Sequence, residues 1–210
     1  MSQTNIKAVF FDFMGTCLDW HTSVVKSLPP SIPEVERSKL ALEWRRRYFL
    51  ENSQRHQQEL SPEDIDITLA RVLDAVLPDF PTSNAAISPD IKGKIIQAWH
   101  SQPAWPEVGK AIRSLRDDLG LEVFVHANGV YKPSPLAYQK ALDLVKLNPE
   151  EVVLVAAHAY DLRGAQSVGL KTVYIQRWTD DIDEDMDKVR TEFDEFLEDM
   201  ENLPGVISRM

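Results

Sequence analysis

Four short apolar segments, separated by stretches with helical periodicity, constrain the fold of this chain more than any other feature. The segments are KAVFFD from Lys7, LEVFVH from Leu121, VVLVAA from Val152 and KTVYI from Lys171. Runs that are apolar at nearly every position are typical of parallel strands buried on both faces of a sheet. Because helical patterns lie between them, the sequence predicts an α/β core with a parallel sheet.

The interval between the first two strand segments carries helical signals throughout. Ser61-Pro62-Glu63-Asp64 and Ser88-Pro89-Asp90 each combine a capping residue, a proline for the first turn and early acidic residues. Apolar residues follow each of them at helical spacing. We therefore expect a helical insertion at residues 21–100, with the core formed by residues 1–20 and 101–210.

Negative charge gathers near the carboxyl end of the chain. The protein has 23 basic and 33 acidic residues, a net charge of −10, and Asp180 to Glu201 alone carries 12 acids and 2 bases. The acidic balance argues against nucleic acid or an anionic membrane surface as a partner. This segment predicts an amphipathic helix with a solvated acidic face rather than a site for a basic partner. Its apolar positions are Met186, Val189, Phe193, Phe196, Leu197 and Met200.

Cysteine content and hydropathy favour a soluble cytoplasmic protein. Cys17 is the single cysteine and has no internal partner for a disulfide, which fits a reducing compartment. The amino-terminal sequence reaches Asp12 after four apolar residues, and no apolar run approaches the ~18 residues of a membrane span. We expect neither a signal peptide nor a membrane segment.

Two carboxylates stand where predicted strands end. Asp12 closes the first strand, and Asp161 follows the third. The carboxyl ends of parallel strands meet at one rim of the sheet, which is where open α/β sheets bind ligands. An alternative for Asp12 alone is that it caps the next turn. A cap would need only one carboxylate. The presence of two at the rim, with Lys132 between them in sequence, favours a ligand site.

Five segments resemble the motif series of the haloacid dehalogenase superfamily. They are FFDFMGTCLDW from Phe10, Trp44-Arg45, HANG from His126, VYKPSPLAY from Val130 and VAAHAYDLRGA from Val155. The ordered set is most similar to the (S)-2-haloacid dehalogenase branch. The particular residues within the motifs are most similar to those of its fungal dehalogenase-like members. The resemblance spans nearly the whole chain. It implies a Rossmann-like, three-layer core and makes the helical insertion a cap that excludes water.

The same resemblance implies a reaction and residues that perform it. Asp12 would attack the halogen-bearing carbon of a small 2-substituted carboxylic acid, giving an aspartyl ester that water hydrolyses. Thr16 would hold the Asp12 carboxylate and Lys132 would keep it ionised. Asp161 would position Lys132 or the water. Arg45 would receive the halide. The other residues expected to bind the substrate are Trp44, Tyr138, Met14 and Asn128.

Three residues depart from the branch's pattern. Ala127 and Ala156 stand in place of serines, and His158 stands in place of an asparagine. An imidazole can accept a proton near neutral pH, so we predict that His158 handles protons, with Asp161 fixing its orientation. The alternative is a structural histidine that supports the turn.

The connection after Asn128-Gly129 is shorter than in the branch, because it runs straight into Lys132. We expect the core to lack one edge strand with its helix, leaving four parallel strands in the order 2-1-3-4. An exposed sheet edge needs a cover, and a second protomer in a homodimer is one candidate. The short connection is either an evolved deletion or an artefact of the exon boundaries assigned to the gene.

Two other functions compete with a dehalogenase-like hydrolase. Phosphatases of the superfamily carry a second aspartate where this chain has Met14, and methionine cannot transfer a proton. With only Asp12 and Asp161 visible as carboxylates for a magnesium site, we expect no metal and no cofactor. The other alternative is a family member that has lost hydrolysis and acts as a binding protein or a biosynthetic catalyst. Ala127, Ala156 and the short connection favour it.

Overall fold

Five parallel strands form the sheet of this protein in a computed structural model that describes residues 5–61, 63–126 and 132–210. The strands pair in the order β2-β1-β3-β4-β5. Their bounds are Ala8–Phe11 for β1, Glu122–Val125 for β2, Val152–Ala156 for β3, Lys171–Ile175 for β4 and Glu195–Leu197 for β5. The predicted α/β fold with a parallel sheet is confirmed.

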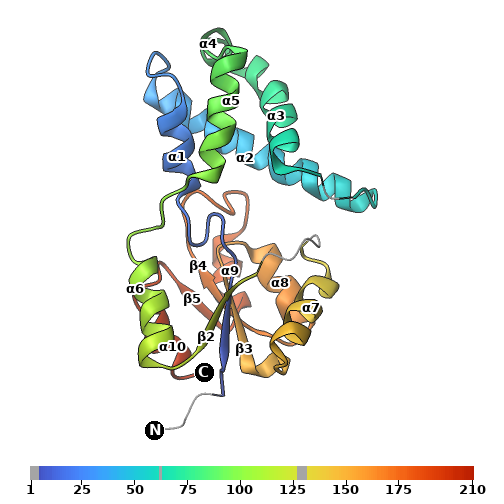
Figure 1. Cartoon of the computed structure of the whole chain (residues 1–210), viewed down its shortest axis with the longest axis vertical. Helices are drawn as coiled ribbons and strands as arrows, with labels where there is room; N and C mark the ends of the chain where they lie inside the picture. The colour runs from blue at the N-terminus through green and yellow to red at the C-terminus, as the bar shows by residue number, and fades with distance from the viewer. Residues whose placement is uncertain (1–4, 62, 127–131) are drawn as a thin grey trace. The chain divides into compact units, whose positions relative to one another are not determined.

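The chain divides into two compact units (Figure 1). One consists of Met1–Leu18 and Ala104–Met210 and holds the whole sheet. The other is Asp19–Pro103. The first unit will be called the core unit and the second the helical unit.

Alternating side chains of the strands serve two separate layers of the core unit. Val9 and Phe11 of β1 pack on one face of the sheet, against α6 and α10, whereas Ala8 and Phe10 pack on the other, against α7, α8 and α9. This alternation is the period of two expected of a strand buried on both faces. The helices are α6 (Val108–Arg113, continued by a π-helical turn at Ser114–Asp118), α7 (Pro135–Val145), α8 (Ala159–Ser167), α9 (Met186–Glu192) and α10 (Leu203–Ile207), with a 3₁₀ turn at Pro149–Glu151.

The expectation of one amphipathic helix in the acidic segment is wrong, because the chain leaves the helix at Phe193 and forms β5. The Asp194 carboxylate accepts hydrogen bonds from the backbone N–H and hydroxyl of Thr172, both at 2.9 Å. Phe193 and Phe196 then stack on Tyr174 of β4, with ring centroids 6.0 and 5.4 Å away. These contacts with β4 outweigh the helical periodicity. The expectation of four strands is therefore wrong, because β5 adds a fifth strand beside β4, while the order of the other four is as expected.

β2 lies at the opposite edge of the sheet, next to β1, as the expected order places it. Two of its apolar side chains are exposed, Phe124 at 38% and Val125 at 52%. The shortened connection that follows, with Ala127 and Asn128, falls outside the described residues.

The described part of the helical unit, residues 19–61 and 63–103, has only helical elements. Ser88 caps α5 as expected, but α3 begins later than Ser61-Pro62 suggests, because the Asp64 side chain caps it by accepting from Asp66 N–H at 2.8 Å. The elements are α1 (Trp20–Ser27), α2 (Glu34–Gln57), α3 (Ile65–Val76), α4 (Pro81–Ala86) and α5 (Pro89–Gln97), with 3₁₀ turns at Leu77–Asp79 and Ala98–His100.

Among the residues that the structure describes, none of the helices combines the length and the apolar character needed to cross a bilayer.

Candidate active site

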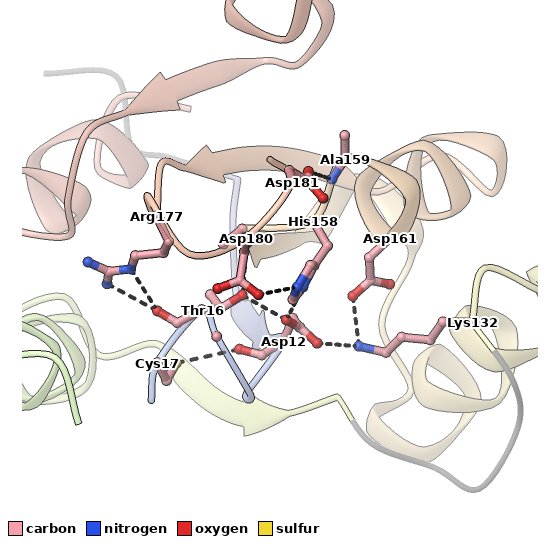
Figure 2. A network of polar contacts seen from close by, with 12 residues as sticks. Asp12, Thr16, Cys17, Lys132, His158, Ala159, Asp161, Arg177, Asp180 and Asp181 are labelled. Atoms are coloured by element: carbon pink, nitrogen blue, oxygen red, sulfur yellow. Dashed lines mark hydrogen bonds and ion pairs between the residues drawn. The ribbon is translucent and has the colours of Figure 1, made fainter. Parts of the chain in front are cut away.

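Asp12 follows β1 directly, and its backbone N–H donates to the Val155 carbonyl of β3 at 3.0 Å. Asp12 therefore lies at the carboxyl ends of β1 and β3, two central strands of the sheet. The Thr16 hydroxyl donates to Asp12 Oδ2 at 2.7 Å (Figure 2). Its oxygen accepts from Ala157 N–H at 2.8 Å. Ala157 N–H can only donate, so it uses the Thr16 oxygen as an acceptor. The single hydroxyl hydrogen of Thr16 therefore points at Asp12.

Lys132 joins the two rim carboxylates (Figure 2). Its Nζ lies 3.0 Å from Asp12 Oδ1 and 2.7 Å from Asp161 Oδ2, so the structure brings together three side chains that are far apart in sequence. Burial opposes the charges, but Lys132 and His158 hold the pKa of Asp12 well below its usual range. Against the same burial, Asp12 and Asp161 raise the pKa of Lys132. Asp12 is therefore an ionised carboxylate at any physiological pH.

Tyr138 of α7 contacts Asp161 of this group. Its hydroxyl donates to Asp161 Oδ1 at 2.6 Å, and burial, followed by the charge of Asp161, raises the pKa of the phenol, which keeps it a donor. Gly164 of α8 makes room for the ring, since a Cβ there would lie 2.5 Å from the Tyr138 hydroxyl and 2.7 Å from Cε2. Tyr138 is fully buried and contacts Asp161, and its contribution to a substrate site stays a prediction.

We expect Gly164→Ala to lower the free energy of unfolding by roughly 1–3 kcal/mol, because the added methyl group overpacks the contact with Tyr138. A glycine-to-alanine change inside a helix ordinarily stabilises by up to about 1 kcal/mol, so the sign of the effect is diagnostic. Gly93→Ala is the matched control, because a Cβ on Gly93 of α5 meets no atom within 4 Å. Denaturant unfolding followed by circular dichroism measures both, and equal stabilisation by the two variants would contradict the packing argument.

His158, the last residue before α8, lies between two carboxylates. Its Nδ1 is 2.9 Å from Asp12 Oδ2 and its Nε2 is 3.0 Å from Asp180 Oδ1. The expectation that Asp161 orients His158 is wrong, because both oxygens of Asp161 face Lys132 and Tyr138. Although burial opposes the charged form, Asp12 and Asp180 raise the pKa of His158 to about 10. The raised pKa favours the positively charged imidazole at neutral pH, which argues against the predicted role of His158 as a proton acceptor.

Asp180 is one of the site residues that the sequence did not reveal. It belongs to the acidic run that was expected to form a solvated face, yet its side chain is completely buried. Counting charges in the run could not separate Asp180 from its exposed neighbours. A usable signal was its place in the chain, since Asp180 follows β4 and the same rim argument that selects Asp12 and Asp161 applies to it.

Arg177 was also missed, and it fixes the turn that carries Thr16. Its guanidinium donates to the Thr16 carbonyl from Nε at 3.2 Å and from Nη2 at 3.0 Å, and Nη2 lies 2.7 Å from Glu107. The guanidinium lies over the Trp105 ring, with Cζ 4.7 Å from the ring centroid. A buried cation with these partners ties the loop after β1 to the loop after β4.

The sequence from residue 6 to residue 169 matches the model of the haloacid dehalogenase-like hydrolases. The chain belongs to this hydrolase family. It is similar to (S)-2-haloacid dehalogenase 4A of Burkholderia cepacia, with 26% identity over 82% of this chain and 84% of that protein. It is also similar to (S)-2-haloacid dehalogenase 1 of Pseudomonas sp. (strain CBS-3), with 28% identity over 82% of this chain and 85% of that protein.

The fold of this haloacid dehalogenase-like hydrolase also has solved counterparts. The structure of L-2-haloacid dehalogenase from Xanthobacter autotrophicus superimposes with a TM-score of 0.73 at 18% identity, covering 98% of this chain and 99% of that chain. The predicted membership of the haloacid dehalogenase superfamily is confirmed.

Two predicted substrate residues of the hydrolase lie in the interior of the helical unit. The Arg45 guanidinium is buried among aromatic rings, with Cζ 5.1 Å from the centroid of Trp20, 4.5 Å from Phe49 and 5.6 Å from Trp99. Trp44 is fully buried, and its indole N–H donates to the Leu69 carbonyl at 3.0 Å. That either residue touches a substrate stays a prediction.

Met14 and Asn128 complete the predicted set. Met14 is half-buried in the turn after Asp12, and Asn128 lies outside the described residues. That either residue contacts a substrate stays a prediction.

The surroundings of Asp12 in this hydrolase do not suit a metal ion. Within residues 5–61, 63–126 and 132–210, no group of three or more His, Cys, Asp or Glu side chains could hold one. Both oxygens of Asp12 already face cations, Lys132 on Oδ1 and protonated His158 on Oδ2. A divalent cation added there would be repelled by both.

Proposed function

We propose that this hydrolase removes the halogen from C2 of a small 2-halocarboxylic acid, with Asp12 as the nucleophile. The observation that carries the proposal is the permanently ionised carboxylate of Asp12, which Thr16, Lys132 and His158 hold at the carboxyl end of β1. The dehalogenase names of the two curated relatives support the same class of substrate.

In this proposal an oxygen of Asp12 forms a bond to C2, and the carbon–halogen bond breaks as the halide leaves with the bonding electrons. The step needs a carboxylate anion and no proton transfer, which suits the low pKa of Asp12. Water then hydrolyses the aspartyl ester and regenerates the carboxylate. Lys132 holds the nucleophile, Asp161 holds Lys132, and the Tyr138 hydroxyl in turn donates to Asp161.

The helical unit would act as the cap that excludes water, and its Arg45 would receive the departing halide. A guanidinium packed among Trp20, Phe49 and Trp99 supports this role, since it offers positive charge within apolar surroundings. Trp44, Tyr138, Met14 and Asn128 would shape the substrate site.

We further propose a cytoplasmic homodimer. The exposed apolar side chains Phe124 and Val125 on the edge strand β2 support a second protomer as the cover of that edge. The single cysteine, Cys17, is buried, and burial raises the pKa of its thiol to about 12, which agrees with a protein that relies on no disulfide.

The experiment that tests the activity offers the protein (S)-2-chloropropionate and p-nitrophenyl phosphate in parallel reactions. We expect chloride release without phosphate release, and the same rate with or without a magnesium chelator. Phosphate release that collapses with chelator would instead establish a metal-dependent phosphatase. Release of neither product would favour the non-hydrolytic alternative.

A further inference from the structure

Both ring nitrogens of His158 face carboxylate oxygens, Nδ1 at 2.9 Å from Asp12 and Nε2 at 3.0 Å from Asp180. A neutral imidazole carries one N–H and could donate to only one of them. The other nitrogen would then present a lone pair to an anion in a buried place, which costs free energy. With both carboxylates ionised, the geometry therefore favours the imidazolium, with a proton on each nitrogen.

Asp180 is held in place for this contact. The Thr179 hydroxyl donates to Asp180 Oδ2 at 2.8 Å, which leaves Oδ1 for His158. Gly15 lets the carboxylate approach, because a Cβ at this residue would lie 2.7 to 2.8 Å from the three atoms of the Asp180 carboxylate group. The loop after β1 and the loop after β4 are thus shaped for an aspartate at this position.

The two oxygens of Asp12 have different partners. Oδ2 accepts from the Thr16 hydroxyl at 2.7 Å and from His158 Nδ1 at 2.9 Å, whereas Oδ1 faces Lys132 Nζ at 3.0 Å. Two donors fixed by Ala157 N–H and by Asp180 converge on Oδ2. Oδ2 is therefore the oxygen best prepared to carry negative charge, and Oδ1 is the one left to bond with C2.

We propose that Asp180 is a positioning residue that fixes His158 as a cation, and that this imidazolium and the Thr16 hydroxyl form an oxyanion hole for Asp12 Oδ2 during hydrolysis of the aspartyl ester. The proposal rests on the proposed dehalogenase function. The water oxygen bonds to Cγ, and negative charge develops on Oδ2. The Cγ–Oδ1 bond then breaks. The alcohol leaves with one water proton, and the other passes to solvent as Asp12 regains its charge.

The charged groups around His158 agree with this assignment. Burial alone would lower its pKa, yet the neighbouring carboxylates raise the pKa to about 10. Lys132 binds the other oxygen of Asp12, so its charge also stabilises that carboxylate. Within the part of the chain that the structure describes, the titratable and charged groups that face the imidazole include Asp12 from the loop after β1, Asp180 and Asp181 from the loop after β4, and Tyr160 from α8.

The sign of the pH dependence separates this role from that of a base. A required imidazolium is present below its pKa and is lost as the pH rises through it, so activity falls on the alkaline side. A required neutral base is lost as the pH falls, so activity falls on the acidic side. Removing the Asp180 charge should lower the pKa of His158 and move the alkaline fall of activity toward neutral pH.

The test follows the ¹⁵N resonances of the His158 imidazole against pH in wild type and in Asp180→Asn. We expect no titration of His158 below about pH 9 in wild type and a shift of the midpoint downward by at least about one pH unit in the variant. The matched control is Asp183→Asn, which removes the same charge from an exposed residue of the same loop and should leave the midpoint unchanged. A wild-type midpoint between pH 5 and 8 overturns the proposal, even if the variant does not fold.

A second measurement concerns the ester. In Asp180→Asn quenched during turnover of (S)-2-chloropropionate, intact-mass spectrometry should show more esterified protein than in wild type, because hydrolysis is slowed more than ester formation. An equal loss of both steps at every pH would mean that Asp180 is structural only and would overturn the role in hydrolysis. If wild type releases no chloride at all, the proposed function fails, while the NMR titration still decides the charge state of His158.

Discussion

Asp12→Asn should reduce chloride release from (S)-2-chloropropionate by about 10⁴-fold or more, because a neutral amide cannot form the ester. Steady-state halide assays at saturating substrate measure this loss. We expect the fold to survive, since asparagine has nearly the same shape and each buried cation keeps a second carboxylate. Lys132 retains Asp161 at 2.7 Å, and His158 retains Asp180 at 3.0 Å.

A matched control for this variant is Asp117→Asn, which removes an exposed carboxylate from the same unit and should leave turnover unchanged. Circular dichroism and denaturant unfolding show whether Asp12→Asn is folded. A folded variant with wild-type turnover would place the nucleophile elsewhere. An unfolded one would mean that the carboxylate of Asp12 has a structural role that its neighbours do not replace.

Lys132→Met should have the second largest effect, on stability as well as on activity. The substitution leaves Asp12 and the completely buried Asp161 without the cation between them. Removing one partner of a buried ion pair typically costs about 3–5 kcal/mol, and we expect a loss of this size in the free energy of unfolding. Activity should also fall, because the carboxylate of Asp12 is no longer held against Asp161 by a common partner.

The pH dependence of Lys132→Met has a definite sign. Lys132 holds the pKa of Asp12 down, so its removal raises that pKa and activity should be lost at a higher pH as the solution is acidified. In wild type, the depressed pKa of Asp12 contributes stability that is present above the unfolded value of about 3.9 and lost as the pH falls below it. This acid-dependent loss should be smaller in the variant. Lys140→Met, at an exposed position of α7, is the control and should change neither profile.

The core layout and the first three rim residues could be predicted from residue patterns alone. Strands that are apolar on both faces, such as β1 and β3, must be buried in a layered fold wherever they occur. The end of such a strand is also defined locally, so Asp12 and Asp161 could be assigned to one rim before any distance was known. Lys132 is identified from the resemblance of its motif to that of the family. Once both carboxylates lie at one rim, a lysine placed there can contact both of them.

Tertiary contacts alone decided the rest. β5 exists because Asp194 accepts from Thr172 and two phenylalanines stack on Tyr174, and these partners are about twenty residues away in sequence. The pKa of His158 is raised because the fold placed Asp180 on its second nitrogen. A helical period or a run of acids reports only on neighbours along the chain. The burial and charge state of a side chain depend on which distant group fills the space beside it, and that is settled only when the strands and loops pack.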